Sequence, residues 1–296
     1  NHDLFTHYNP FTGLQYKDDP AICLSELTNE DDLFEREVKI EPYYSELVAK
    51  YHKWCKAKGL QPEQDVRFRA DFSRQVTEFM VEVQQSYYLE MIGHLRSIGV
   101  KIPITGTNWS VGVHNRTAQL VTDFCDDHNY YILWEWKEHS KRFKATHMLS
   151  EHDPFVGPLC FSRNFGYPMF ISEWDVPWPN HYRAESPVYL AAVAAFQGWS
   201  GCAIHTYRYG THTYNTDRIG KDLTAGAIGG VPYREGMFNT FNDPAKFGLF
   251  YAAALLLRRG DLQQGKKSIE IEFEEGDLQL SALSDTRRIP ALKGLA

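Results

Sequence analysis

Short apolar runs alternate along this chain with longer stretches in which apolar residues recur every three or four positions. A short run bounded by turn residues is typical of a buried strand, and the three-to-four spacing is typical of a helix that covers one. The predicted strands lie in residues 21–28, 100–105, 122–126, 168–178 and 200–206. The predicted helices lie in residues 42–59, 72–97, 115–121, 187–199 and 244–259. Strands that alternate with helices predict a parallel α/β architecture.

The pattern changes toward the end of the chain. Residues 266–283 alternate between apolar and polar side chains, which is typical of a strand with one face in solvent. We therefore predict that residues 1–262 form the main domain. Residues 263–296 are predicted to form a tail or the first strand of a separate β module.

Polar and aromatic residues follow each predicted strand. They are Glu30, Asn108 with Trp109, His128 with Tyr130, Glu173, and His205. The carboxyl ends of parallel strands are where barrel enzymes place their chemistry. In residues 168–178, Met169 to Ile171 form a buried run and Pro177 prevents regular continuation of the strand. Glu173 therefore ends this strand, either as a functional carboxylate or as a merely solvated one.

The composition excludes several classes of protein. The chain has 296 residues, of which 43% are hydrophobic, and its formal charge is −7. This acidic balance argues against nucleic-acid partners and anionic membranes, because both require basic patches. No apolar run approaches the roughly 18 residues of a membrane span. We expect a soluble protein that is large enough for one core of the barrel type.

Cysteine and histidine spacing predicts neither a disulfide framework nor a metal site. The cysteines lie far apart without a CxxC pair, at Cys23, Cys55, Cys125, Cys160 and Cys202. Buried free thiols are the favoured interpretation over disulfides or zinc ligands. The twelve histidines include no HExxH spacing, and the glycines form no phosphate-binding loop. We expect no metal and no cofactor.

Glu30 and Glu173 are the candidate catalytic pair. They lie 143 residues apart, each at the end of a predicted strand, and a barrel would bring such ends together. Two carboxylates that face a glycosidic bond are what glycoside hydrolysis requires. One protonates the leaving oxygen, and the other attacks the anomeric carbon or activates water.

Three strand endings resemble a known group of enzymes. Asn29-Glu30, His128-x-Tyr130 and Ser172-Glu173-Trp174 are similar to the ends of strands four, six and seven of clan A glycoside hydrolases. Family five, the cellulase and mannanase group, is the nearest relative by this resemblance, which covers about residues 8–260. It implies a (β/α)8 TIM barrel and a retaining mechanism on an oligo- or polysaccharide.

The resemblance also implies a role for each of these residues. Glu30 would be the general acid/base and Glu173 the nucleophile. Asn29 would bond the sugar 2-hydroxyl, Tyr130 would hold the nucleophile, and His128 would lie beside the acid/base. Each role is chemically reasonable, because an amide that bonds the 2-hydroxyl strengthens its contact in the transition state. For His128 and Tyr130, a polar strand end capped by its own loop is the alternative.

Two departures from the family pattern matter. The family carries an arginine on strand two and a histidine on strand three, yet only 29 residues precede Glu30 here. We therefore predict that residues 1–262 are the C-terminal part of the barrel, with strands one to three missing from this chain and the natural N-terminus absent. A second polypeptide segment would supply those strands, because an open barrel exposes a sheet edge. The family also carries a tryptophan on strand eight, whereas this region offers His205 and Tyr207 instead.

Aromatic residues near the strand ends are candidate sugar platforms, because flat rings pack on the apolar faces of pyranoses. The predicted substrate-binding residues are Asn108, Trp109, Trp174, Trp178, His205 and Tyr207, with Tyr209 as a further candidate. Trp134 and Trp136 lie in the loop that follows His128. For each single aromatic residue, core packing is the alternative.

A second function fits the same residues. A degenerate barrel that lacks its first strands would be a non-catalytic carbohydrate-binding protein. Glycan binding without turnover distinguishes it from an enzyme.

Overall fold

The computed structural model divides the chain into two compact units. The structure describes residues 2–109, 112–131, 135–137, 140–142, 145–150, 155–207, 238–241 and 243–279. Unit 1 contains the described residues within 1–127, 162–168 and 269–295, and unit 2 contains those within 128–161 and 169–268. Both units combine helices with strands, so the predicted α/β class is confirmed.

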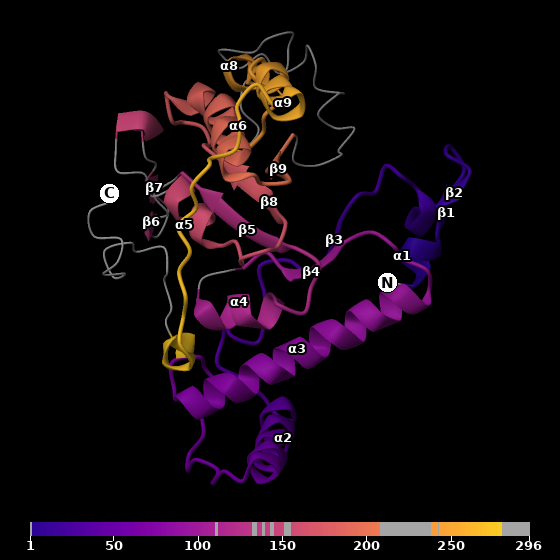
Figure 1. Ribbon diagram of the computed structural model, residues 1–296, viewed down its shortest axis with the longest axis vertical. Helices are drawn as coiled ribbons and strands as arrows, with labels where there is room; N and C mark the ends of the chain where they lie inside the picture. Colours follow the sequence, from indigo (N-terminus) through magenta and orange to yellow (C-terminus); the bar gives the residue numbers. More distant parts are fainter. Residues whose placement is uncertain are drawn as a thin grey trace. The chain divides into compact units, whose positions relative to one another are not determined.

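Unit 1 is built around a parallel strand pair and two long helices (Figure 1). Its elements are α1 (His2–Thr6), β1 (Tyr8–Asn9), β2 (Leu14–Gln15), the 3-10 helix η1 (Tyr16–Asp18), β3 (Ser25–Thr28), α2 (Tyr43–Lys58), α3 (Arg74–Ser97), β4 (Ile104–Thr107), α4 (Val113–Gln119), the start of β5 (Cys125–Tyr130) and the 3-10 helix η4 (Glu275–Gln279). β1 and β2 are antiparallel. β3 and β4 are parallel, with Ser25 opposite Ile104 and Thr28 opposite Thr107.

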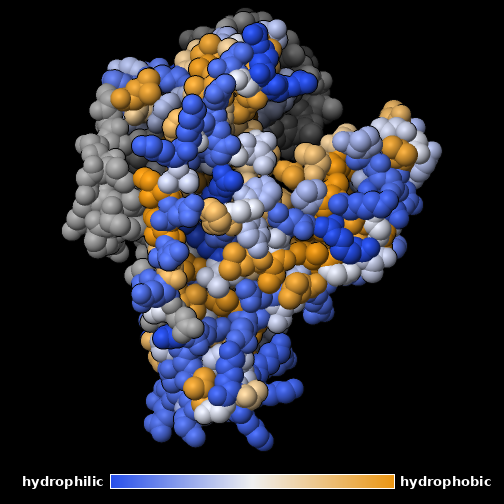
Figure 2. All heavy atoms as spheres, in the orientation of Figure 1, coloured by the Kyte–Doolittle hydropathy of each residue, from blue (hydrophilic) through white to orange (hydrophobic). Residues whose placement is uncertain are grey.

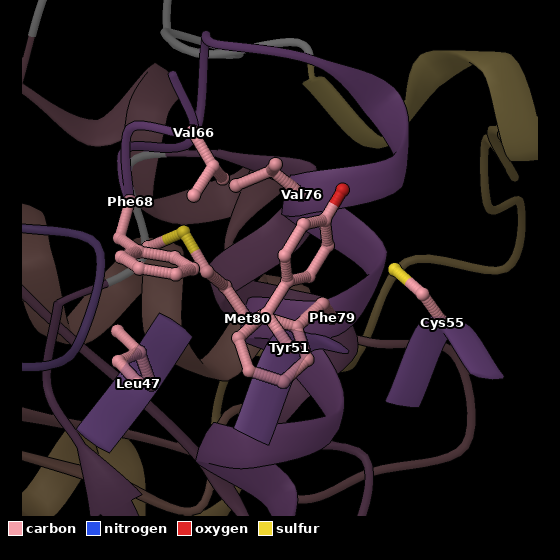
Figure 3. Close-up of a cluster of buried hydrophobic side chains, with 8 residues drawn as sticks. All are labelled: Leu47, Tyr51, Cys55, Val66, Phe68, Val76, Phe79 and Met80. Atoms are coloured by element: carbon pink, nitrogen blue, oxygen red, sulfur yellow. The ribbon is translucent and has the colours of Figure 1, made fainter. Parts of the chain in front are cut away.

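Helices α2 and α3 pack together through a cluster of buried hydrophobic side chains (Figure 3). The cluster consists of Leu47, Tyr51, Cys55, Val66, Phe68, Val76, Phe79 and Met80. Periodicity predicted both helices, and local signals set their ends. The Ser73 side chain accepts a hydrogen bond from the Val76 amide at the start of α3, and Gly59 adopts a left-handed φ of 69° at the end of α2.

The opposite face of α2 is polar. Lys50, Lys53 and Lys56 are exposed, whereas Tyr51 and Cys55 are completely buried. Figure 2 shows the resulting hydrophilic surface over the α2 end of unit 1. This division explains the amphipathic pattern, because the helix buries only the face that meets α3.

Unit 2 contains the end of β5 and the remaining elements (Figure 1). They are β6 (Glu135–Lys137), β7 (Ser140–Arg142), the 3-10 helix η2 (Met148–Ser150), α5 (Val156–Phe161), β8 (Met169–Asp175), the 3-10 helix η3 (Arg183–Glu185), α6 (Ser186–Gln197), β9 (Gly201–Ile204), α8 (Pro244–Phe247) and α9 (Phe250–Arg259). β5, β8 and β9 form one sheet in that order, and β8 and β9 are parallel. Buried residues of β8 and α6, such as Ile171 and Leu190, form part of the core.

Three sequence expectations are corrected. Residues 244–259 form two helices, because Gly248, which has a weak helix preference, interrupts them. Residues 266–274 form no strand, and residues 275–279 form a 3-10 helix. The alternation of apolar and polar residues is not sufficient for a strand, because a strand also needs a neighbouring strand for its backbone hydrogen bonds. β5 extends to Tyr130 instead of ending at Asp126, because its last residues are polar and escape an apolar pattern.

Two simpler expectations can be compared with the structure. The five cysteines are free thiols, as their spacing indicated, but only Cys55 and Cys125 are buried, and Cys23 is exposed. Within the described part of the chain, none of the helices combines the length and the apolar character needed to cross a membrane.

Candidate active site

Glu173 lies at an irregularity of β8. Ile171 pairs with Cys202 and Trp174 with Ile204, so three steps along β8 match two along β9. This is the signature of a β-bulge, which re-aims side chains and is common next to active sites. Ser172 and Glu173, the residues within the bulge, are both half-buried, whereas Ile171 and Trp174 on either side are buried.

His128 shows where the two bulge residues point. Its Nε2 lies 2.8 Å from the Ser172 hydroxyl, and its Nδ1 lies 3.6 Å from Glu173 Oε2. Successive side chains of a regular strand point to opposite faces, so one imidazole could not reach both. The bulge therefore turns Ser172 and Glu173 toward the same side. The side chain of His128 is almost completely buried, at 2% exposed, and Glu173 keeps 21% of its side chain exposed.

Tyr130 donates a short hydrogen bond from its hydroxyl to Glu173 Oε2. His128 and Tyr130 are two residues apart on β5, and therefore share one face of the strand. Their contacts with Glu173 both converge on Oε2. A hydrogen bond to an ionised carboxylate is stronger than a neutral one, so this phenol orients Glu173 effectively.

His205 completes the surroundings of the same carboxylate oxygen. It follows β9 directly, its Nδ1 lies 3.6 Å from Glu173 Oε2, and its side chain is 27% exposed. Its backbone N–H donates to the Trp174 carbonyl, 3.1 Å away, which fixes the strand end. Three polar side chains, those of Tyr130, His128 and His205, therefore surround one oxygen of Glu173.

Phe238 supports two of these side chains, and the sequence offered no signal for it. Its ring lies 5.3 Å from the Tyr130 ring and 5.6 Å from the His205 ring, between centroids, in edge-on geometry. The Tyr130 and His205 rings are themselves perpendicular at 6.3 Å. Because Phe238 is 33 residues beyond His205 in the chain, only the tertiary structure reveals the contact.

Glu30 lies in unit 1 and has an unusual backbone. Its φ is 46°, in the left-handed region that residues with a side chain rarely adopt. The Asn108 side chain holds this conformation, because its Oδ1 accepts the Glu30 N–H at 2.8 Å and its Nδ2 donates to Asn29 Oδ1 at 2.8 Å. Asn108 is completely buried, whereas Asn29 and Glu30 are exposed. Backbone strain of this kind is concentrated at functional sites.

Asp32 anchors the loop that follows Glu30, and the sequence analysis missed it. Its Oδ1 accepts the N–H groups of Phe34 and Glu35 at 2.8 and 3.1 Å, and its Oδ2 accepts from Asn115 at 2.5 Å. Burial raises the pKa of Asp32 to about 6, although these hydrogen bonds oppose the shift. A half-buried polar side chain of this kind, close to a candidate acid, does not show in an apolar pattern.

The predicted site residues thus form two groups. Glu173, His128, Tyr130 and His205 gather in unit 2, and Glu30, Asn29 and Asn108 gather in unit 1. Because the two glutamates belong to different units, their shared sugar-binding site stays a prediction. Asn108 was expected to contact substrate, but it is buried and bonds Asn29 and Glu30 instead.

The aromatic candidates differ in exposure. Trp174 is only 2% exposed and stacks on Phe250 of α9, with 6.1 Å between ring centroids. It belongs to the core, so the predicted platform role is wrong. The reason is that β8 continues through Trp174 to Asp175 instead of ending before it.

Trp178 and Tyr207 are 38% and 61% exposed, and Trp109 is half-buried. Exposed rings keep the open faces that a sugar platform needs. Trp134, Tyr209 and the side chain of Trp136 lie outside the described residues.

Comparison with known proteins adds evidence on the fold alone. No protein-family model matches the chain, and no curated protein matches it. The chain is similar in structure to an endo-beta-1,4-mannanase from Thermotoga petrophila, with a TM-score of 0.50 and 14% sequence identity. The match covers 88% of this chain and 49% of the mannanase chain, so this chain spans about half of that structure's length. The fold is therefore similar to that of a glycoside hydrolase.

Proposed function

We propose that this chain forms part of a retaining β-glycoside hydrolase, with Glu173 as the nucleophile and Glu30 as the general acid/base. The contact that carries the proposal is the hydrogen bond from Tyr130 to Glu173 Oε2, at a bulge near the end of β8 where two histidines approach the same oxygen. A nucleophile must be held in one orientation for attack, and this arrangement supplies the restraint.

The proposed reaction has two steps. The Glu173 carboxylate attacks the anomeric carbon, the glycosidic bond breaks, and Glu30 gives its proton to the departing oxygen. Glu30 then removes a proton from water, and the resulting hydroxyl attacks the anomeric carbon and releases Glu173. The sugar leaves with its original configuration. Asn29 would bond the 2-hydroxyl, and Trp178 and Tyr207 would offer ring faces to sugars.

The proposed substrate is a β-linked oligo- or polysaccharide. β-1,4-Mannan is the first polymer to test, because the similar solved structure is an endo-beta-1,4-mannanase. The proposed fold is the second half of a (β/α)8 barrel, in which β3, β4, β5, β8 and β9 are strands four to eight.

We also propose that a segment of a second polypeptide pairs with the open edge of β3. Among the described residues, β3 has β4 as its one strand neighbour. Parallel sheets are normally larger and covered on both faces. Slower amide hydrogen exchange in β3 when the second polypeptide is bound than in this chain alone would support the pairing. Equal exchange would contradict it.

Substitution of each glutamate, followed by azide rescue, tests the mechanism in the full-length protein. Glu173→Gln and Glu30→Ala should each abolish hydrolysis of β-mannan. With an activated aryl β-glycoside, azide should rescue Glu173→Ala by direct attack and give the α-glycosyl azide. In Glu30→Ala, azide should attack the covalent intermediate and give the β-glycosyl azide.

Glu78→Gln is the control for these variants. Glu78 lies on α3 in an exposed ion pair with Arg74, so its substitution should leave activity unchanged. Full activity of either catalytic variant would refute the proposal. Binding of glycans to a wild-type protein that hydrolyses none of them would select the carbohydrate-binding alternative.

A further inference from the structure

Four charged side chains of unit 2 form two ion pairs inside the protein. Lys246 Nζ donates to Asp175 Oδ1 at 2.6 Å, and both side chains are completely buried. Arg183 donates to Asp243 through Nε at 2.5 Å and through Nη2 at 3.2 Å. The Asp243 side chain is 0% exposed and that of Arg183 is 11% exposed. Lysine and aspartate are almost never fully buried unless they are paired.

Asp243 joins the two pairs. It begins α8 as the capping residue, and its Oδ1 accepts the backbone N–H of Lys246 at 3.4 Å. Burial raises the pKa of Asp175 to about 6, and the charge of Lys246 opposes this shift. Buried ion pairs are expensive to desolvate and often add little stability, so their value more often lies in fixing a unique geometry.

The ion pair connects two segments that both reach the candidate site. Asp175 ends β8, two residues beyond Glu173, and Lys246 belongs to α8. The residues that precede α8 bond the backbone after β9. Phe238 O accepts from Thr206 N at 3.1 Å, and Phe241 N donates to Tyr207 O at 2.9 Å.

This connection closes a ring of contacts around the nucleophile. Phe238 packs on Tyr130 and His205, and both of these side chains approach Glu173 Oε2. A displacement of α8 would therefore move Phe238 away from Tyr130 and loosen the hydrogen bond on Glu173.

We infer that Asp175 and Lys246 are positioning residues for Glu173, which act by holding the Phe238 segment against the end of β8. This inference rests on the proposed function where activity is the readout. Both residues are completely buried and would not contact substrate.

A set of variants in the full-length protein separates positioning from stability. Lys246→Met breaks the pair and leaves Asp175 buried without its cation, whereas Asp175→Asn with Lys246→Met removes both charges. Leu190→Ala is the stability control, because it truncates a completely buried, uncharged side chain of α6 and opens a cavity without removing a member of either ion pair. Lys58→Met is the chemical control, since Lys58 pairs with Glu82 at an exposed site.

We expect Lys246→Met to lower kcat on β-mannan by about 100-fold with KM little changed, because a displacement of about 1 Å costs this much. The kcat of the double variant should recover to within about tenfold of the wild-type value, because replacing a buried ion pair by two neutral side chains costs little stability. Both controls should keep the wild-type kcat when assayed well below their unfolding temperatures. An unchanged kcat in Lys246→Met, or a double variant as slow as the single one, would overturn the inference.

A second measurement does not depend on activity. The ring signals of His128 and His205 in carbon-13-labelled protein can be assigned with His128→Gln and His205→Asn. The chemical shifts of these ring signals should differ from wild type in Lys246→Met. They should return to the wild-type values in the double variant and remain at those values in Leu190→Ala. Unshifted signals in Lys246→Met would overturn the positioning role. If the wild type hydrolyses no substrate but the signals shift as expected, the proposed function fails and the positioning inference stands.

Discussion

Tyr130 and Glu173 lie on adjacent strands, and the phenolic hydroxyl of Tyr130 donates to Oε2 of Glu173. The β-bulge at Ser172 and Glu173 turns both of these side chains toward His128, so His128 contacts Glu173 as well. His205 approaches the same oxygen from the end of β9. A carboxylate with this many directed neighbours is held in one orientation. A nucleophile requires such a fixed orientation for attack.

Removal of the Tyr130 hydroxyl should slow the proposed reaction. Tyr130→Phe should lower kcat by about 10- to 100-fold, because a hydrogen bond to a charged group contributes about 1.5–3 kcal/mol. Steady-state kinetics on β-mannan measures the effect. Tyr131→Phe is the matched control, since the neighbouring hydroxyl bonds Thr146 instead. Equal losses in both variants would show that the Tyr130 hydroxyl has no special role.

Substitution of Trp174 should affect stability, whereas substitution of Trp178 should affect sugar binding. Trp174→Ala should lower the free energy of unfolding by about 3–5 kcal/mol, because it removes a buried ring stacked on Phe250. Trp178→Ala should change stability by less than about 1 kcal/mol, since the ring is 38% exposed. Its Kd for manno-oligosaccharides should instead rise about tenfold through the loss of a ring face. Denaturation and calorimetry measure the two effects, and an unchanged Kd would exclude Trp178 from the sugar site.

Gly106 on β4 should not tolerate a side chain. A Cβ at this position would lie 2.4 Å from Tyr88 Cζ, and Tyr88 is completely buried. Gly106→Ala should therefore lower the free energy of unfolding by about 1–3 kcal/mol. Gly93→Ala on α3 is the control, because its Cβ would meet nothing within 4 Å and should stabilise the helix by about 0.5–1 kcal/mol. Urea denaturation compares them, and the same sign for both variants would contradict the packing described.

Asp32 should make stability depend on pH. Burial raises its folded-state pKa from 3.8 to about 6, so between about pH 4 and 6 the folded protein holds a proton that the unfolded chain has released. The contribution of Asp32 to stability therefore falls as pH rises through this window.

Asp32→Asn removes this titration and keeps an oxygen for the Phe34 and Glu35 amides. The Asn115 amide can rotate to present Oδ1, which has no hydrogen-bond partner among the described residues. The variant should gain about 2–3 kcal/mol relative to wild type between pH 4 and pH 7. Urea denaturation at each pH gives the difference, in which the titration of Asp175 cancels. A pH-independent difference would show that Asp32 titrates normally.

Local patterns determined much of the fold in advance. The three-to-four spacing of apolar residues identified α2 and α3, and Gly59 marked the end of α2, because helix hydrogen bonds and caps involve near neighbours. The apolar run before Glu173 predicted the strand that is β8, although β8 continues two residues beyond Glu173 to Asp175 instead of ending there. The polar residues of β5 were recognised as candidates, although the strand that carries them was drawn too short.

The tertiary structure alone decided what surrounds those residues. The register shift in β8, the stacking of Trp174 on Phe250 and the contact of Phe238 with Tyr130 depend on segments far apart in the chain. Asp175 and Lys246 are separated by 71 positions, and no local spacing indicates that they pair. A sequence pattern reports which face of an element is apolar. Which distant side chain meets that face depends on how the whole chain packs, and this packing selected Tyr130 and His205 as the neighbours of Glu173.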